Sequence, residues 1–116
     1  MKFTHLTSFV VNFLKNDLDV KFITYEVVKE VADILGIGAE IIEVDGKKML
    51  KISTRDKLYK MPTNALNAIV SEWLRRGRSA DELFEILSKN RHRLKVVEER
   101  VKYERLKEKF KDLALP

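Results

Sequence analysis

The first third of the chain spaces its apolar residues as two amphipathic helices do. One helix is predicted over residues 4–17, with Thr4 as its N-cap and an apolar stripe of Leu6, Phe9, Val10, Phe13 and Leu14. A second is predicted over residues 24–35, where Thr24 can cap the start and Gly36 can take the left-handed conformation that ends a helix.

The pattern then changes to that of a β-hairpin. Asp45-Gly46 is typical of a type I′ turn, and it sets residues 39–44 opposite residues 47–52. In this register two opposite-charge pairs and two apolar pairs face each other: Glu43 with Lys48, Glu40 with Lys51, Ile42 with Met49, and Ile41 with Leu50. Such cross-strand pairs contribute about 0.2–1 kcal/mol each. We expect a core face of Ala39, Ile41, Leu50 and Ile52, and a third strand over residues 57–61.

Three further helices are predicted after the strands. Pro62 opens a helix whose apolar stripe includes Trp73, expected in the core, and Gly77 ends it. Ser79 and Glu82 form a capping box, so residues 77–79 make a tight corner between two helices. From Asn90 the chain is rich in charge, and a long helix, bent or broken near Asn90, is predicted beyond it.

These elements predict an α+β fold. We expect a helix-dominated single domain with a two- to three-stranded antiparallel hairpin or meander at about residues 39–61 and a long C-terminal helix. Residues 1–90 are expected to form a compact helix-helix-hairpin-helix-helix domain. Residues 91–116 are expected to form a charged helix that packs on this domain or serves in oligomerisation. A length of 116 residues, 45% of them hydrophobic, fits one domain.

Charge is distributed unevenly along the chain, whose net charge is +5. Residues 1–46 contain four Lys or Arg against eight Asp or Glu, residues 47–79 nine against two, and residues 80–116 ten against eight. The positive centre therefore coincides with the hairpin and the helix that follows it. Such a centre is typical of a surface that binds phosphates. A merely solvated or protein-binding surface is an equal alternative, because lysines also protect edge strands from aggregation.

We predict a small non-catalytic nucleic-acid-binding protein that binds DNA in preference to RNA. A DNA-binding regulator is one such protein. The candidate contacts lie on the hairpin and the turn after it, at the helix corner, and on the next helix: Lys47, Lys48, Lys51, Arg55, Lys57, Arg75, Arg76, Arg78, Arg91 and Arg93, with Lys60 beside them. Tyr59 and Tyr103 are candidates for exposed base stacking. For Tyr59, burial in the core is the slightly favoured alternative.

A second function remains open. A partial heptad, interrupted by Glu99, is formed by Val96, Tyr103, Leu106, Phe110 and Leu113. It is typical of a helix that pairs with another helix. The alternative is therefore a protein–protein interaction or oligomerisation module, with a homodimer formed through the C-terminal helix.

Other classes lack support in the sequence. No motif indicates catalysis, cysteine is absent, and His5 and His92 lack the spacing of metal ligands, so we expect no enzyme, metal or cofactor. No apolar run approaches the roughly 20 residues that span a bilayer. The N-terminus lacks a signal-peptide pattern, so we expect no membrane partner and a cytoplasmic location. The absence of Gln beside 15 Lys and 11 Glu is typical of a thermophile.

Two segments resemble DNA-binding folds. Residues 61–87 resemble a ribbon-helix-helix domain through Met61-Pro62, Leu66, Ile69, the Gly77-Arg78-Ser79 corner and Leu83-Phe84, although 60 residues precede Met61. Residues 6–53 resemble the second half of a winged helix. That resemblance implies wing contacts by Lys47, Lys48 and Lys51 and a recognition helix over residues 24–35, whose surface includes the acidic Glu26, Glu30 and Asp33.

Overall fold

The fold is given by a computed structural model that describes residues 3–113, with side chains described for residues 6–111. The predicted cap at Thr4 and the side chains of His5 and Leu113 lie outside the described side chains. In chain order the elements are α1 Phe3–Asn12, the π-helical turn η1 Phe13–Asp17, α2 Tyr25–Ile34, β1 Ala39–Val44, β2 Lys47–Ile52, β3 Leu58–Tyr59, α3 Pro62–Arg75, α4 Ala80–Lys89 and α5 Arg91–Leu113.

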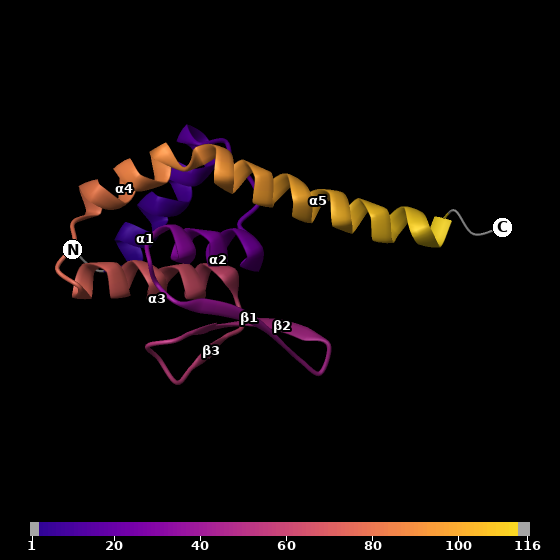
Figure 1. Cartoon of the computed structure of the whole chain (residues 1–116), viewed down its shortest axis with the longest axis horizontal. Coiled ribbons are helices and arrows are strands. Elements are labelled where there is room, and N and C mark those ends of the chain that lie inside the picture. Colours follow the sequence, from indigo (N-terminus) through magenta and orange to yellow (C-terminus); the bar gives the residue numbers. More distant parts are fainter. Residues whose placement is uncertain (1–2, 114–116) are drawn as a thin grey trace.

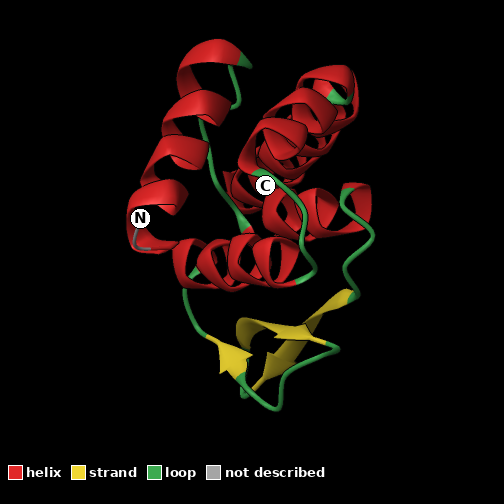
Figure 2. Ribbon diagram, turned by 90° about the vertical axis from the view of Figure 1, so that its left-hand side faces the viewer, coloured by secondary structure: helices red, strands yellow, loops and turns green. Residues whose placement is uncertain are grey.

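The helices form a layer on one face of the small sheet, which confirms the predicted helix-dominated α+β fold (Figures 1 and 2). Helices α2 and α3 contact the sheet directly, while α1 packs on α3 and α5 packs on α2 and α4. The described part of the chain measures 57 × 32 × 21 Å. Its long axis follows α5, whose second half extends beyond the body (Figure 1).

The hairpin forms in the predicted register. Glu40 pairs with Lys51 and Glu43 with Lys48 across the two strands. Positive φ angles at Asp45 and Gly46, 52° and 78°, give the turn the backbone that a type I′ hairpin needs. The third strand is shorter than predicted: only Leu58–Tyr59 pairs with β2, in the order β1-β2-β3. The chain leaves the sheet there because Met61 is already the N-cap of α3.

The predicted helix boundaries are also confirmed. The hydroxyl of Thr24 accepts a hydrogen bond from the N–H of Val27, 3.2 Å away. Ser79 and Glu82 form the complete capping box. Gly77 has a φ of 78°, a left-handed conformation that glycine adopts without strain and that allows the chain to turn between α3 and α4. The first helix reaches Asp17 as predicted, but its last turn is π-helical.

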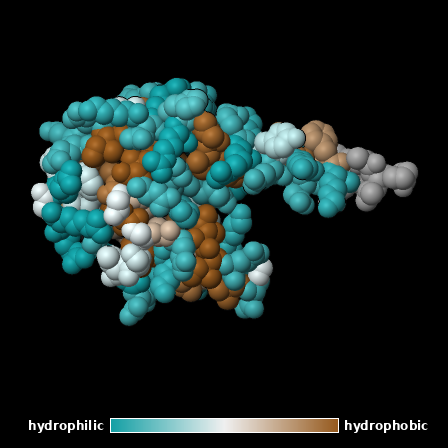
Figure 3. Space-filling view, viewed as in Figure 1, coloured by the Kyte–Doolittle hydropathy of each residue, from teal (hydrophilic) through white to brown (hydrophobic). Residues whose placement is uncertain are grey.

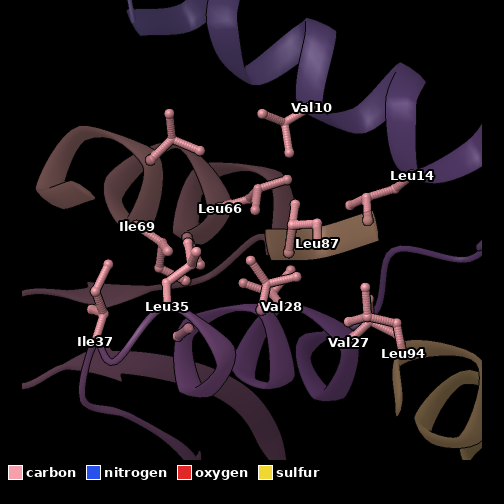
Figure 4. Packing of buried hydrophobic residues seen from close by; sticks show 14 of the residues in the cluster. Val10, Leu14, Val27, Val28, Leu35, Ile37, Leu66, Ile69, Leu87 and Leu94 are labelled. Carbon is pink, nitrogen blue, oxygen red and sulfur yellow. The ribbon is translucent and has the colours of Figure 1, made fainter. Parts of the chain in front are cut away.

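The core lies between the helices and against the inner face of the sheet. Leu50 and Ile52 of β2 are fully buried beneath the helices. Figure 4 shows Val10 of α1 pointing toward Leu66 of α3, and Val27 of α2 beside Leu94 of α5. Trp73 is buried, as predicted. The core therefore includes residues from both ends of the chain.

Helix α5 contributes to this core only over its first three turns. Leu94, Val97 and Val101 are buried. Every side chain from Lys102 to Lys111 is exposed. The change from a packed to a projecting helix therefore occurs after Val101, rather than at the corner near Asn90.

Two leucines of α5 provide a matched test of this boundary. Leu94→Ala should lower the free energy of unfolding by about 2–5 kcal/mol, because it leaves a cavity in the core. Leu106→Ala removes the same atoms from a side chain that is 43% exposed, and should change the free energy of unfolding by less than about 0.5 kcal/mol. Urea unfolding monitored by circular dichroism measures both. Equal losses would contradict the boundary.

Candidate nucleic-acid interface

The lysines of β2 divide between the two faces of the sheet. Side chains alternate along a strand, so Lys48 shares the inner face with the buried Leu50. Its ammonium lies 2.8 Å from a carboxylate oxygen of Glu26 on α2. Lys47 and Lys51 lie on the opposite, outer face and are exposed. Lys48 is therefore neutralised within the molecule, while Lys47 and Lys51 face solvent.

A polar pocket of about 540 Å³ lies where β3, one of the two edge strands of the sheet, meets α3. Three cations and four side chains with amide or hydroxyl groups line it, and no carboxylate does: the lining residues are Arg55, Lys57, Leu58, Tyr59, Lys60, Asn64, Asn67, Ala68 and Ser71. Because none of these cations has a neighbouring acid in the lining, the pocket suits an anion or another hydrogen-bonding ligand.

The wall of the pocket is held by contacts within the chain. The Thr7 hydroxyl of α1 donates to Oδ1 of Asn67 over 2.6 Å, and the Ser71 hydroxyl donates to the carbonyl oxygen of Asn67 over 2.8 Å. The Lys57 ammonium lies 5.5 Å from the centre of the Tyr59 ring, within range of a cation–π interaction. Tyr59 is only 7% exposed. Of the two interpretations of Tyr59, burial in the core is confirmed and exposed stacking is wrong, because the ring packs on the core side of β3, opposite Leu50.

The arginines of the helix corner are engaged with acidic and aromatic neighbours. Glu72 of α3 is 2% exposed. Arg75 donates to both of its carboxylate oxygens, over 2.8 and 2.9 Å, and Arg76 donates to it over 3.4 Å. Arg76 also donates to the carbonyl oxygen of Gly36, which ties the end of α3 to the turn before β1. Hydrogen bonds from Arg75 hold the pKa of the Glu72 carboxyl below its ordinary value, against the opposing effect of burial.

Arg78 completes this corner. Its guanidinium lies 4.5 Å from the centre of the Trp73 ring and 2.9 Å from a carboxylate oxygen of Glu82. The Trp73 indole N–H in turn donates to the carbonyl oxygen of Ser79 over 2.8 Å. The guanidinium of Arg78 therefore covers the Trp73 ring, and its ion pair with Glu82 holds one member of the capping box in place. Arg78 has a structural role that its position in the sequence does not reveal.

The candidate arginines of α5 bind other parts of the chain as well. Arg91 donates to the carbonyl oxygen of Leu18 over 2.9 Å, and Arg93 forms an ion pair with Glu30 of α2. These contacts fix the start of α5 against residues that precede it by more than sixty positions.

The predicted contacts thus separate into two groups. Six of them bind acidic groups or carbonyl oxygens of this chain: Lys48, Arg75, Arg76, Arg78, Arg91 and Arg93. The other four have no ion pair among the described residues, and with Lys60 they surround the outer side and edge of the sheet. We call this set, Lys47, Lys51, Arg55, Lys57 and Lys60, the strand-side basic surface.

The sequence reasoning overlooked the polar residues of the pocket. Asn64, Asn67 and Ser71 lie on one side of α3 at the i, i+3, i+7 spacing of a helical stripe. That stripe was available as a signal beside the apolar stripe of the same helix. Among the described residues, no group of three or more His, Asp or Glu side chains is placed to hold a metal ion, and no helix is long and apolar enough to cross a membrane.

Glu72 generates a prediction about stability and pH. Because its pKa is lowered by folding, its contribution is complete above its unfolded value near 4.5 and is lost as the pH falls through the lower folded value. Glu72→Gln should lower the free energy of unfolding by about 1.5–3 kcal/mol at pH 7, the usual value of hydrogen bonds to a charged group. The difference from the original protein should shrink at pH 3.

The control is Glu85→Gln, which alters an exposed pair with Lys89 and should change the free energy of unfolding by less than about 0.5 kcal/mol at either pH. Urea unfolding at pH 7 and pH 3 gives all four differences. An effect of Glu72→Gln that is the same at both pH values would show that the charge of Glu72 does not stabilise the corner.

Comparison with known proteins found no matching family model, no matching curated protein and no matching solved structure. The resemblances to ribbon-helix-helix and winged-helix folds therefore gain no support from relatives, and the function has to be argued from the surface itself.

Proposed function

We propose that this chain binds nucleic acid through the phosphate backbone, using the strand-side basic surface. The observation that carries the proposal is the pairing state of its cations. Lys47, Lys51, Arg55 and Lys60 form no ion pair among the described residues, although Glu40 lies across from Lys51 on the outer face, and Lys57 contacts the ring of Tyr59. A cation with no partner keeps its full charge for an external anion. Each phosphate that it neutralises releases counterions and so adds to the affinity.

The geometry supports contact with more than one phosphate. Lys47 and Lys51 lie on the same face of β2, about 14 Å apart at the rise of an antiparallel strand. Lys51 lies opposite Leu58 of the edge strand, so the surface continues from the outer face around β3 into the pocket. Within the pocket, Arg55 can bind a phosphate with two parallel hydrogen bonds. The side-chain amides of Asn64 and Asn67 on α3 can donate to phosphate or sugar oxygens.

We propose duplex DNA as the preferred ligand. Recognition of single-stranded nucleic acid, and most sequence-specific recognition of RNA, uses exposed aromatic rings as stacking platforms. The aromatic residue of the pocket beside the strand-side basic surface, Tyr59, is buried and supplies no such platform. Contacts to the backbone of a duplex need cations and donors, which the surface has. We propose that this binding takes place in the cytoplasm and is non-catalytic.

The proposal reassigns the helix corner. Its arginines already contact groups of this chain: Arg75 and Arg76 bind Glu72, and Arg78 binds Glu82 and covers the ring of Trp73. We therefore assign them a structural role. Lys48, Arg91 and Arg93 are treated in the same way because they bind Glu26, the carbonyl oxygen of Leu18 and Glu30. We add Lys60 to the proposed interface because it lines the pocket beside Arg55 and Lys57. In the sequence it was named beside the ten candidate contacts.

A second candidate function concerns α5. Tyr103, Leu106 and Phe110 are 66%, 43% and 59% exposed on its projecting half. Large apolar side chains grouped on an exposed helix are typical of a protein interaction site. We therefore propose an assembly role for α5 beside the nucleic-acid-binding role of the sheet.

The interface is tested with the triple variant Lys51→Gln, Arg55→Gln and Lys57→Gln. Loss of three phosphate contacts should reduce the slope of log K against log salt by about 2.7 and weaken duplex binding roughly 100-fold at 0.1 M salt. Fluorescence anisotropy with a labelled DNA duplex at several salt concentrations measures both quantities. The effect should not depend on the sequence of the duplex.

The matched control is Lys15→Gln, Lys21→Gln and Lys89→Gln, which removes the same three charges from exposed positions outside the proposed interface. It should retain most of the affinity and nearly all of the salt slope. If both triple variants lose affinity equally, net charge alone governs binding and the assigned interface is wrong. Absence of binding by the original protein at low salt would remove the proposed function.

A further inference from the structure

Helix α5 has an apolar stripe on the side away from the core, which begins in its packed part and continues along its projecting half. Val96, Tyr103 and Phe110 follow each other at intervals of seven residues, and Leu106 lies between the last two. All four are between 43% and 66% exposed. Figure 3 shows pale and brown side chains interrupting the hydrophilic surface of this projecting helix. The intervals of three, four and seven place these residues in the a and d positions of a coiled coil. We call this set the α5 stripe.

The residues that flank the α5 stripe are all cations. In the same heptad, the e positions beyond Glu99 are Arg100 and Lys107, and the g positions are Lys102 and Lys109. All four are exposed, and none has an ion pair among the described residues. The acidic residues Glu104 and Glu108 occupy other positions of the heptad, b and f. Flanking charges at e and g decide which helices pair.

An apolar groove of about 250 Å³ runs beside the stripe. Phe22, from the segment between η1 and α2, and Val101 and Leu106 of α5 supply its apolar lining. Lys102, Arg105 and Lys109 lie around it. Phe22 is 55% exposed. The one acid of the lining, Glu98, is buried and accepts hydrogen bonds from Lys95 and from the N–H of Phe22. Leu106 belongs to both the groove and the stripe, so the two form one surface.

The charge pattern disfavours pairing between two copies of this chain. In a parallel pair, the g residue Lys102 meets the e residue Lys107 of the second copy. In an antiparallel pair, g positions meet g positions, so lysines again face lysines. Either arrangement brings like charges together along the whole seam. A homodimer through α5, which the sequence left open as part of the alternative function, is therefore not the assembly that this surface favours.

We propose that the α5 stripe docks an amphipathic helix of another protein whose apolar seam is flanked by Asp or Glu. This inference rests on the assembly role proposed for α5 and adds the chemical class of the partner. Acidic flanks would pair with Arg100, Lys102, Lys107 and Lys109, while an apolar side chain of the partner enters the groove beside Phe22. The exposed Glu99 occupies a d position and separates Val96 from the rest of the stripe, so the docked length is the two turns from Tyr103 to Phe110.

The test uses two synthetic three-heptad helical peptides as probes. Both have Leu at a and d; one has Glu at every e and g position and the other has Lys. Fluorescence anisotropy with the full chain should show at least tenfold tighter binding of the Glu peptide. The double variant Lys102→Glu and Lys109→Glu should abolish this preference, because two glutamates then oppose the remaining cations Arg100 and Lys107. The control Lys15→Glu and Lys111→Glu, which changes the net charge equally outside the e and g positions, should preserve it.

Contact through the apolar seam is tested with Tyr103→Ser and Phe110→Ser together. Both side chains are exposed, so thermal unfolding should be unchanged while binding of the Glu peptide is lost. Retained binding by this variant would show that charge alone attracts the peptide and would overturn the docking site. Equal binding of the two peptides would overturn the acidic partner.

Sedimentation velocity and vesicle binding identify the other occupants of the stripe. A dimer of the full chain that Tyr103→Ser and Phe110→Ser abolish would keep the assembly role and overturn the acidic partner. Stripe-dependent binding to vesicles of phosphatidylglycerol and phosphatidylcholine without peptide binding would assign the surface to lipid. A monomer that binds neither peptides nor vesicles would remove both the inference and the assembly role.

Discussion

Two glutamates among the described residues, Glu72 and Glu98, are buried, and the need to neutralise their carboxylates organises much of this molecule. A buried carboxylate is stable only with cations or hydrogen-bond donors beside it. Glu72 takes the guanidinium groups of Arg75 and Arg76, and Arg76 also holds the turn at Gly36. Glu98 takes the Lys95 ammonium and the N–H of Phe22, which ties α5 to the segment before α2. These cations serve the fold.

The cations that remain define the surfaces available for binding. One set surrounds the outer side and edge of the sheet, next to a pocket without carboxylates. The other flanks an apolar stripe on the projecting half of α5. The first combines charge with hydrogen-bonding groups and suits phosphates. The second combines charge with large apolar side chains and suits an acidic helix. The two surfaces lie on different elements, so one can be altered without the other.

The helices and strands could be predicted because turn and cap residues within each segment determine where it begins, ends and pairs. The Asp45-Gly46 turn and the facing Glu–Lys pairs specify one register, and the structure has that register. Ser79 and Glu82 likewise specify a helix start. The candidate site was predicted only in part, because the sequence shows where cations are and not which are neutralised. Lys48 meets Glu26 across 22 residues, and Arg91 meets Leu18 across 73. Such pairings depend on how distant segments of the chain pack together, which the spacing of residues in the sequence does not show.

The central claim is that unpaired cations of the strand-side basic surface, and not the arginines of the helix corner, contact nucleic acid. The most direct measurement is a titration of the isotope-labelled chain with a DNA duplex, followed by two-dimensional NMR of the backbone amides. The account predicts that the shifts concentrate in residues 47–60 and along residues 64–71. Shifts centred on residues 75–82, with the sheet unaffected, would contradict it.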